Sequence, residues 1–275
     1  MGTCVGYPEE LVNDGNIDAY YENLNVNCSS FLNAMMSVNI FNLDVTFKRL
    51  GTTVNSCYWI DNAKDVTLIN AYYSLLHNRI MLPAAFLQNL LFDRNRPHYM
   101  NYAVTGMIIG HEMTHGFDDS GKNYDKHGNQ HNWWSNKSLQ EFKKRTQCII
   151  EQYQNYKIPE LNASINGELS QGENVADNGG LKQSYLAYLH WVDRNSVEKT
   201  LPGFKYTTNQ LFWISFAQIW CSYESIDVLK IHLDDPHPPS RLRVIGTLSN
   251  SESFAEDFDC PLNSPMNPKQ KCKVW

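Results

Sequence analysis

The chain has 275 residues, of which 42% are hydrophobic, and it carries a formal net charge of −6. The length and hydrophobic content indicate one large globular domain with a substantial core. The acidic balance and the lack of a basic run argue against nucleic-acid binding, and no apolar stretch approaches the roughly 18 to 20 residues that a membrane span needs. No secretory signal is visible at the amino end.

Residues 1–65 alternate short helical and polar stretches, and we expect a partial helical region that leads into a core formed by residues 66–275. The segment from Val66 to Tyr73 is rich in β-forming residues and predicts a strand. A second strand is expected from Arg79 to Leu82. An edge strand at this place would allow a peptide to add to the sheet as one more strand.

A helix is predicted from about Tyr99 to Gly116. Its first part, up to Gly110, is mostly apolar, and residues 111–115 read His-Glu-Met-Thr-His. Positions i and i+4 share one face of a helix, so His111 and His115 can reach one ion while Glu112 lies beside them. Metal-assisted peptide hydrolysis needs this combination of two nitrogen ligands and a carboxylate. The alternative is a pair of ordinary surface or core histidines, which the apolar context disfavours because unpaired polar groups are costly to bury.

The third metal ligand must come from elsewhere in the chain. In one subclass of the zinc peptidases with this motif, a third histidine follows the second by six residues. This chain has Gly121 at that position, so the third ligand is not a histidine there. The best candidate is Glu173 on a later helix, and Asp177 lies four residues on, hence on the same helix face. Asp177 is suited to hold the second ring nitrogen of one metal-bound histidine, and Asp118 or Asp119 that of the other. Without the histidine motif, a solvated acidic face would be the better interpretation of Glu173 and Asp177.

Further helices are expected at three places in the second half of the chain, with these bounds: from the N-cap Ser135 to about Tyr156, from Glu173 to about Val192, and from Thr208 to about Tyr223. Glycines within two of the helices, Gly106, Gly110, Gly179 and Gly180, imply close approach of a neighbouring backbone. His127 and His131 are also four residues apart, but the polar, glycine-containing segment around them favours a loop over a second metal site.

These motifs resemble the C-terminal catalytic part of the neprilysin and endothelin-converting-enzyme family of zinc metalloendopeptidases. The match covers nearly the whole chain, in the family's order: residues 5–8, 70–73, 82–84, 111–119, 124–126, 133–134, 172–180, 216–218, 237, 243–248 and 272–275. The expected fold is α+β and mostly helical, a thermolysin-like zincin with a glutamate as third ligand and a small sheet beside the active-site helix.

The resemblance implies one zinc ion (Zn2+) per chain, with His111, His115 and Glu173 as its ligands. Glu112 resembles the general base in a Glu-assisted attack of a zinc-bound water, after which it passes the proton to the leaving amine. Asp177 resembles the partner of a zinc-bound histidine.

Other implied roles concern the peptide substrate. Asn70 and Ala71 match the edge segment that hydrogen-bonds the substrate backbone, Arg243 matches an arginine that binds a substrate carbonyl, and His237 matches a histidine that stabilises the oxyanion. Without the resemblance, a surface salt bridge for Arg243 and a plain loop histidine for His237 are the default interpretations. The family cuts on the amino side of large apolar residues, and the positions that match its pocket are all apolar, although core packing alone also explains them: Phe86, Leu91, Met107, Ile108, Ile219 and Trp220.

The chain departs from the family at residues 83–87, where Pro-Ala-Ala-Phe-Leu stands for Pro-Ala-Gly-Ile-Leu, and at Asn89 and Leu90, which replace Pro-Pro. The larger Phe86 would make the pocket shallower. The family's upstream roofing domain and membrane anchor are expected to be absent here, so that cell-surface placement belongs to a parent protein and no membrane contact comes from this chain. A fragment that binds zinc or peptide without turnover is therefore the alternative function.

Seven cysteines are many for a cytosolic enzyme. By resemblance, Cys148 pairs with Cys272, while Cys221 and Cys260 stay free together with at least one of three others: Cys4, Cys28 and Cys57. Three N-x-S sequons, at Asn27, Asn136 and Asn162, favour an extracellular setting in combination with the cysteines. The sequence does not indicate an oligomeric state.

Overall fold

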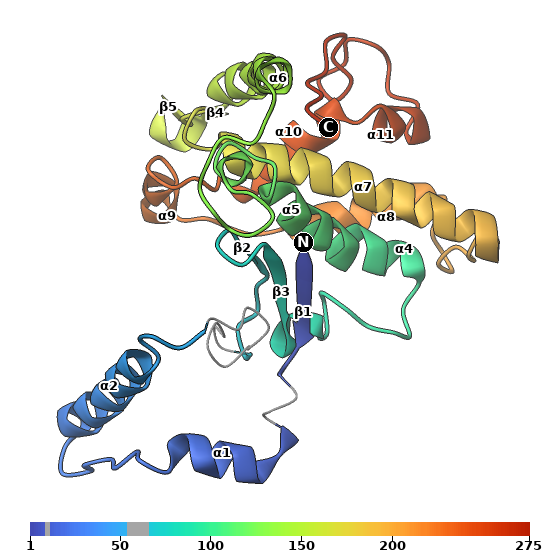
Figure 1. Ribbon diagram of the computed structural model, residues 1–275. Coiled ribbons are helices and arrows are strands. Elements are labelled where there is room, and N and C mark those ends of the chain that lie inside the picture. Colours follow the sequence, from blue (N-terminus) through green and yellow to red (C-terminus); the bar gives the residue numbers. More distant parts are fainter. Residues whose placement is uncertain (9–11, 54–65) are drawn as a thin grey trace.

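The computed structural model describes residues 1–8, 12–53 and 66–275. Its centre is a pair of adjacent helical rods (Figure 1). One rod runs through α4 (His98–Asn101), a π-helical turn (Tyr102–Gly106) and α5 (Met107–His115), and the other is the long helix α7 (Gln171–Asn195). The predicted α+β, mostly helical fold is confirmed, and so is the helix that carries the His-Glu-x-x-His motif.

The two rods touch backbone to backbone where the motif begins. A Cβ atom on Gly110 would lie 2.8 Å from the Cα of Gly180, and one on Gly180 would collide with the backbone nitrogen of His111. Only glycine permits this separation of the two helices. The predicted close approach of a backbone is therefore confirmed for Gly110 and Gly180, and it fixes the distance between the two halves of the metal site. A Cβ atom on Gly106 or Gly179 would instead meet a side chain, that of Ser184 or Thr114.

A small sheet lies beside α5, with strand order β1-β3-β2. The strand β1 (Gly2–Gly6) pairs in parallel with β3 (Arg79–Pro83), and β2 (Tyr72–Ser74) pairs antiparallel with β3. The strand predicted from Val66 is wrong in extent, because it begins only at Tyr72. The N–H of Ala71 is bonded to the side-chain oxygen of Asn70 instead of to a neighbouring strand.

The helices α1 (Asp14–Tyr21) and α2 (Phe31–Lys48) lie beyond the sheet, on the side away from α7 (Figure 1). Both helices lie within residues 12–53 of the first part of the chain. The strand β1 was not expected there, and it makes residues 2–6 part of the sheet. The boundary expected after residue 65 therefore does not separate helices from sheet among the described residues.

The remaining helices surround the rods. The helix α6 (Asn136–Gln154) begins after the predicted cap, because the Ser135 hydroxyl accepts a hydrogen bond from the N–H of Ser138. The helix α8 (Thr208–Gln218) ends five residues before the predicted Tyr223. Shorter elements complete the chain: α9 (Ile226–Ile231), α10 (Ser240–Asn250), α11 (Glu252–Asp257), the hairpin of β4 (Lys157–Ile158) and β5 (Ala163–Ser164), and single helical turns at Ala84–Leu87, Gly121–Asn123 and Pro159–Leu161.

Aromatic and aliphatic side chains between α4, α7 and α8 form the largest core cluster, which includes Tyr99, Met107, Tyr188, Phe212 and Trp213. Burial of such side chains contributes roughly 1.5 to 3 kcal/mol each. This cluster therefore fixes the metal-binding helix against α7 and α8.

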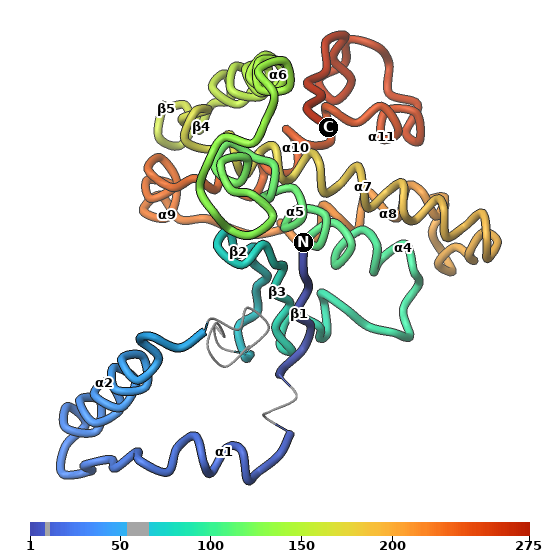
Figure 2. The backbone as a smooth tube through the Cα atoms, in the orientation of Figure 1, coloured from blue at the N-terminus to red at the C-terminus, as the bar shows by residue number. Residues whose placement is uncertain are grey.

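The C-terminal tail returns to the body of the molecule beside α10 and α11 (Figure 2). The disulfide between Cys148 and Cys272 ties the tail to α6, with 5.5 Å between the Cα atoms. Four cysteines among the described residues are free: Cys4, Cys28, Cys221 and Cys260. Cys57 lies outside the described residues. Within residues 1–8, 12–53 and 66–275, no helix has the length and apolarity required to span a membrane.

Candidate metal centre and peptide cavity

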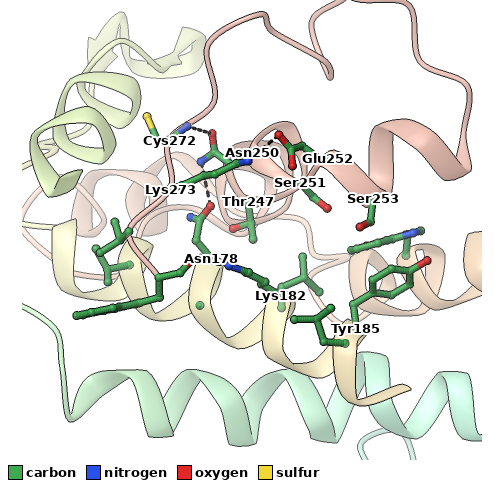
Figure 3. Close-up of a pocket in the computed structure, with 17 residues that line it drawn as sticks. Asn178, Lys182, Tyr185, Thr247, Asn250, Ser251, Glu252, Ser253, Cys272 and Lys273 are labelled. Carbon is green, nitrogen blue, oxygen red and sulfur yellow. Dashed lines mark hydrogen bonds and ion pairs between the residues drawn. The ribbon is translucent and has the colours of Figure 1, made fainter. Parts of the chain in front are cut away.

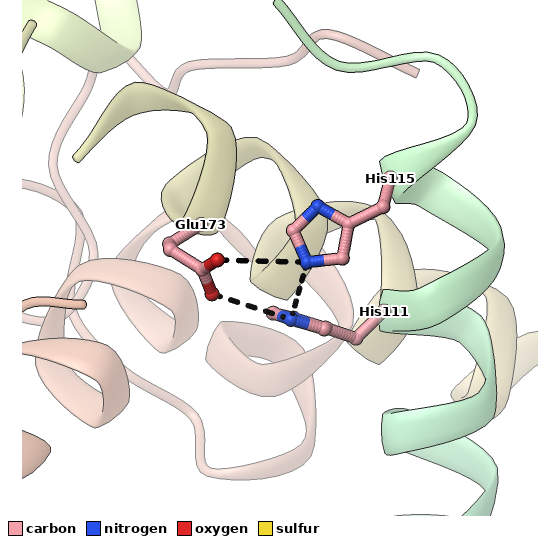
Figure 4. A group of neighbouring side chains, drawn as sticks. All are labelled: His111, His115 and Glu173. Carbon is pink, nitrogen blue, oxygen red and sulfur yellow. Dashed lines mark hydrogen bonds and ion pairs between the residues drawn. The ribbon is translucent and has the colours of Figure 1, made fainter. Parts of the chain in front are cut away.

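Three potential metal ligands converge between α5 and the first turn of α7 (Figure 4). The Nε2 atoms of His111 and His115 lie 2.9 Å apart. Glu173 places Oε2 3.3 Å from His111 Nε2 and Oε1 3.6 Å from His115 Nε2. The three ligand atoms lie within 4.8 Å of one another. Helical spacing within one rod and the close contact between the rods thus produce a tripod of two nitrogens and a carboxylate.

The arrangement of protons and lone pairs in this tripod fits a cation. His111 Nδ1 lies 2.8 Å from Asp177 Oδ1, and His115 Nδ1 lies 2.7 Å from Asp118 Oδ2. Both Nδ1 atoms face carboxylates and donate to them, so in the neutral rings both Nε2 atoms offer lone pairs to the same point. Glu173 Oε2 is buried there without a hydrogen-bond partner. A zinc ion would satisfy all three atoms, and the donor set is one that zinc prefers.

The pKa values of His111 and Glu173 indicate which of the two carries a proton when no metal is bound. Burial alone lowers the pKa of His111, but contacts with Asp177 and Glu173 outweigh it and raise the value to about 9. Burial raises the pKa of Glu173, yet the neighbouring histidines lower it to about 2. A proton on His111 therefore neutralises part of the site, and metal binding must release that proton.

Glu112 lies beside the ligands and lines the same cavity, with 5% of its surface exposed. Burial raises its pKa, although the two histidines of the motif act in the opposite direction. A carboxylate with a raised pKa is a better proton acceptor than an ordinary surface glutamate. Glu112 thus combines a place in the wall of the cavity with a raised pKa.

Arg243 of α10 is buried and forms two hydrogen bonds with Asp177, from Nε to Oδ2 over 2.8 Å and from Nη2 to Oδ1 over 2.6 Å. Nη2 also lies 3.6 Å from Glu173 Oε2, and the guanidinium stands 4.1 Å from the centre of the Trp220 ring. The surface salt bridge that is the default interpretation of such an arginine is therefore wrong. Asp177 links this arginine to His111.

His237 lies in the loop between α9 and α10. Its Nε2 is 3.3 Å from Glu173 Oε2, and Asp235 Oδ1 accepts hydrogen bonds from the N–H of His237 and from its Nδ1. A further contact joins the carbonyl of His237 to Nδ1 of His232. Asp235 and His232 were not found from the sequence, although the Asp-x-His spacing is one at which an aspartate caps a turn.

A cavity of about 640 Å³ extends from the metal site to the edge of the sheet. Asn70 and Ala71 line the cavity together with Glu173, and the edge strand β2 adjoins them. The polar residues of the site lie together on its surface: His111, Glu112, His115, Asp118, Glu173, His237 and Arg243. The structure thus brings the metal ligands, the candidate base and the expected substrate-binding segment around one space.

The predicted apolar pocket is only partly present in this cavity. Met107, Ile108 and Trp220 line it. Phe86 does not, because it is 1% exposed and packs into the cluster under the sheet, with Leu91 against it. Ile219 also does not line the cavity and caps the C-terminal end of α8. The large side chain of Phe86 therefore lies behind the wall of the cavity and does not narrow it directly.

Two other groups of predicted residues lie away from this site. His127 and His131 occupy an exposed loop, and in the part of the chain that the structure describes the metal-ligand cluster is the one at Glu173. The asparagines of the three sequons are exposed: Asn27, Asn136 and Asn162.

The family model of peptidase family M13 matches residues 70–274. The chain belongs to peptidase family M13. Its match spans the sheet edge, both halves of the metal site and the C-terminal tail. The resemblance seen in the motifs is thereby confirmed.

Known relatives agree with this membership. The chain is 43% identical to Neprilysin-2 of Drosophila melanogaster over 276 aligned residues, which cover 100% of this chain and 36% of that protein. It is 44% identical to Endothelin-converting enzyme 1 of Rattus norvegicus over 98% of this chain and 35% of the relative. The chain therefore spans about a third of the length of these M13 proteins.

Solved structures give the same fold. The zinc metalloprotease ZMP1 of Mycobacterium tuberculosis, in complex with an inhibitor, superposes with a TM-score of 0.87 at 30% identity, over 100% of this chain and 41% of that one. PEPO from Lactobacillus rhamnosis has a TM-score of 0.81 at 30% identity, over 98% of this chain and 39% of that one.

Proposed function

We propose that this chain carries the catalytic centre of a zinc-dependent endopeptidase that cleaves oligopeptides. The observation that supports it best is the convergence of His111, His115 and Glu173 beside the buried Glu112, in a cavity bounded by a sheet edge. Membership in family M13 supports the same reaction class. His111, His115 and Glu173 would hold the ion.

Zinc, when bound, supplies a Lewis acid that polarises a carbonyl and lowers the pKa of water to about 7. The chain's own groups supply the rest of the chemistry. Glu112 accepts the proton of the attacking water and returns it to the amine that leaves. His237 and Arg243, which both lie next to Glu173, donate hydrogen bonds to the carbonyl oxygens of the substrate.

The peptide is proposed to lie along Asn70 and Ala71 as an additional strand beside β2. The side chain that follows the scissile bond then faces Met107, Ile108 and Trp220. These apolar walls favour a large apolar residue at that position, because its burial contributes roughly 1.5 to 3 kcal/mol.

We propose that the parent protein works outside the cell, where the disulfide between Cys148 and Cys272 is stable and the exposed sequon asparagines can carry glycans. Residues 66–275 would form the peptidase core. In that setting, peptides are the expected partners.

The test is cleavage of a quenched fluorescent peptide that has one phenylalanine after the scissile bond. Glu112→Gln keeps the size of the side chain and removes its basicity, so we expect kcat to fall by about 100-fold to 10,000-fold while zinc content stays at one per chain. Glu151→Gln, at an exposed position of α6, is the matched control and should behave as wild type.

Cleavage that survives Glu112→Gln would contradict the role of this glutamate. A wild-type chain that binds zinc and the peptide but never cleaves it would favour the fragment without turnover. A chain without zinc would exclude both functions.

A further inference from the structure

We propose that Glu224 and His232, which do not line the cavity, are positioning residues that hold His237 in place for the reaction. The inference deepens the proposed function and rests on it. It assigns to this pair the task of fixing the loop between α9 and α10, which carries the histidine that faces the substrate carbonyl.

The first observation is the contact of the His232 ring with the peptide backbone of the loop. His232 Nδ1 lies 2.9 Å from the carbonyl oxygen of His237. A carbonyl only accepts, so Nδ1 must donate. The ring belongs to a residue that caps α9 with helical backbone angles, φ −62 and ψ −15, and whose N–H is bonded to the carbonyl of Val228. The donor is therefore mounted on a helix end.

The second observation is the carboxylate on the other side of the ring. Glu224 Oε1 lies 3.4 Å from His232 Nε2 and accepts hydrogen bonds from the backbone N–H of Ser240 over 3.3 Å and from its hydroxyl over 3.1 Å. Ser240 is the first residue of α10, the helix that presents Arg243. One carboxylate oxygen thus connects the start of α9, the ring of His232 and the start of α10.

The third observation is how little else restrains His237. Its side chain is 51% exposed, so apolar packing cannot fix the ring. Asp235 fixes the N–H and Nδ1 of His237, and His232 fixes its carbonyl. The remaining ring atom, Nε2, points at Glu173. A catalytic group held by hydrogen bonds is sensitive to their loss, because a displacement of 1 Å costs about 100-fold in rate.

Two substitutions separate the positioning hydrogen bond from mere filling of space. His232→Leu removes the donor and keeps much of the volume. His232→Asn carries an amide N–H at nearly the place of Nδ1 and keeps the bond to the carbonyl of His237. His190→Asn, at an exposed position of α7, is the matched control.

In the full zinc-loaded chain we expect His232→Leu to lower kcat by about tenfold, with KM and zinc content as in wild type. His232→Asn should restore kcat to within about threefold of wild type, and Glu224→Gln should fall between the two variants. In a His237→Ala background, His232→Leu should change kcat by less than about twofold, since the group that it positions is gone. An equal loss of kcat in both backgrounds would overturn the inference, and so would a loss that His232→Asn does not restore.

A measurement that needs no turnover tests the inference separately from the proposed function. In the full chain labelled with ¹⁵N-histidine, the ring signals of His237 should shift in His232→Leu and remain near their wild-type positions in His232→Asn and His190→Asn. Unchanged His237 signals in His232→Leu would overturn the positioning role. A wild-type chain that cleaves no peptide would remove the proposed function, while these ring signals would still decide the contact.

Discussion

The long helix α7 borders two cavities with polar linings, one on each side. Glu173 lines the metal cavity and Asp177 is buried against His111, whereas Asn178 and Lys182 belong to the wall of a second cavity of about 180 Å³ beside the C-terminal tail (Figure 3). At 3.6 residues per turn, Lys182 points to the side of the helix opposite Glu173. The same helix therefore allows a direct comparison of two polar sites that share one backbone.

The polar groups of the second cavity have partners within the protein. Asn178 accepts a hydrogen bond from Asn250 over 2.9 Å, Lys182 donates to the carbonyl of Trp275 over 2.7 Å, and Lys273 pairs with Glu252 over 2.6 Å. In the metal cavity, Nε2 of His111 and Nε2 of His237 each lie 3.3 Å from Oε2 of Glu173, a buried carboxylate oxygen that has no hydrogen-bond partner. Polar side chains thus occur in both cavities and do not distinguish the metal cavity from the second one, whereas a buried polar atom without a hydrogen-bond partner does.

The largest expected difference between the two faces of α7 is the effect of removing one charge on zinc affinity. Glu173→Gln leaves a neutral amide among the metal ligands, and we expect the zinc affinity to fall by several orders of magnitude. Lys182→Gln, on the opposite face, should bind zinc as wild type does. Titration with zinc against a competing chelator measures both affinities. Retention of tight zinc binding by Glu173→Gln would mean that another group is the third ligand.

The second prediction concerns the tail that closes the second cavity. The disulfide joins residues 124 positions apart, and Cys148→Ser with Cys272→Ser should lower the free energy of unfolding by roughly 2 to 5 kcal/mol. Zinc affinity should not change, because the metal ligands lie on the other face of α7. Urea unfolding and zinc titration of the same double variant check both statements, and a parallel loss of zinc affinity would show that the tail supports the metal face.

The third prediction is that the free energy of unfolding of the metal-free chain depends on pH through His111 on the metal face. The pKa of His111 is raised from 6.5 to about 9 in the folded chain. Protonated His111 therefore adds to the free energy of unfolding, by on the order of 3 kcal/mol. This contribution is fully present below pH 6.5 and is lost as the pH rises through about 9. The pKa of Glu173, lowered to about 2, adds no slope in this range, since its contribution is lost only as the pH falls below 4.5.

The check is urea unfolding of the metal-free chain between pH 6 and pH 9.5, with the exposed His190→Gln as control. The slope should persist in the control and disappear in His111→Gln. Zinc should remove the slope as well, because the ion replaces the proton on His111. A slope that is unchanged in His111→Gln would assign the titration to another group.

Local sequence patterns were sufficient to predict the helices around the metal site and the contact between them. The helical spacing of His111 and His115, the cap at Ser135 and the contact implied by Gly110 and Gly180 all depend on neighbouring residues or on the need for space. The disulfide and the family came from longer motifs. These features survive any change elsewhere in the chain that keeps the helices.

Features that depend on distant pairing could not be predicted. The strand β1 forms only because residues 2–6 meet residues 79–83, and nothing local marks it. Phe86 was expected in the pocket, but whether an apolar side chain lines a cavity or lies behind its wall depends on the packing of the sheet. The contact of His232 with His237 depends on the path of a loop, and that path is fixed by the contact itself together with Asp235.

The smallest expected effect tests whether the two faces of α7 are independent. Asp177→Asn keeps a side-chain oxygen but must turn its amide toward either His111 or Arg243, both of which donate to the carboxylate in wild type. Loss of such a partner behind a metal-bound histidine typically weakens metal binding by about 10-fold to 100-fold. The neighbouring Asn178→Ala loses its bond with Asn250 and should lower the free energy of unfolding by about 1 kcal/mol, with unchanged zinc affinity.

Both quantities are measured on both variants, by zinc titration and by urea unfolding of the zinc-bound chain. If Asn178→Ala weakened zinc binding as much as Asp177→Asn, a displacement on the tail side of α7 would reach the metal ligands through the helix backbone. The tight contact of Gly180 with α5 makes such transmission costly, since neither helix can rotate without a collision. Independence of the two faces is therefore the outcome that the packing predicts, and the pair of adjacent residues is the most sensitive place to look for its failure.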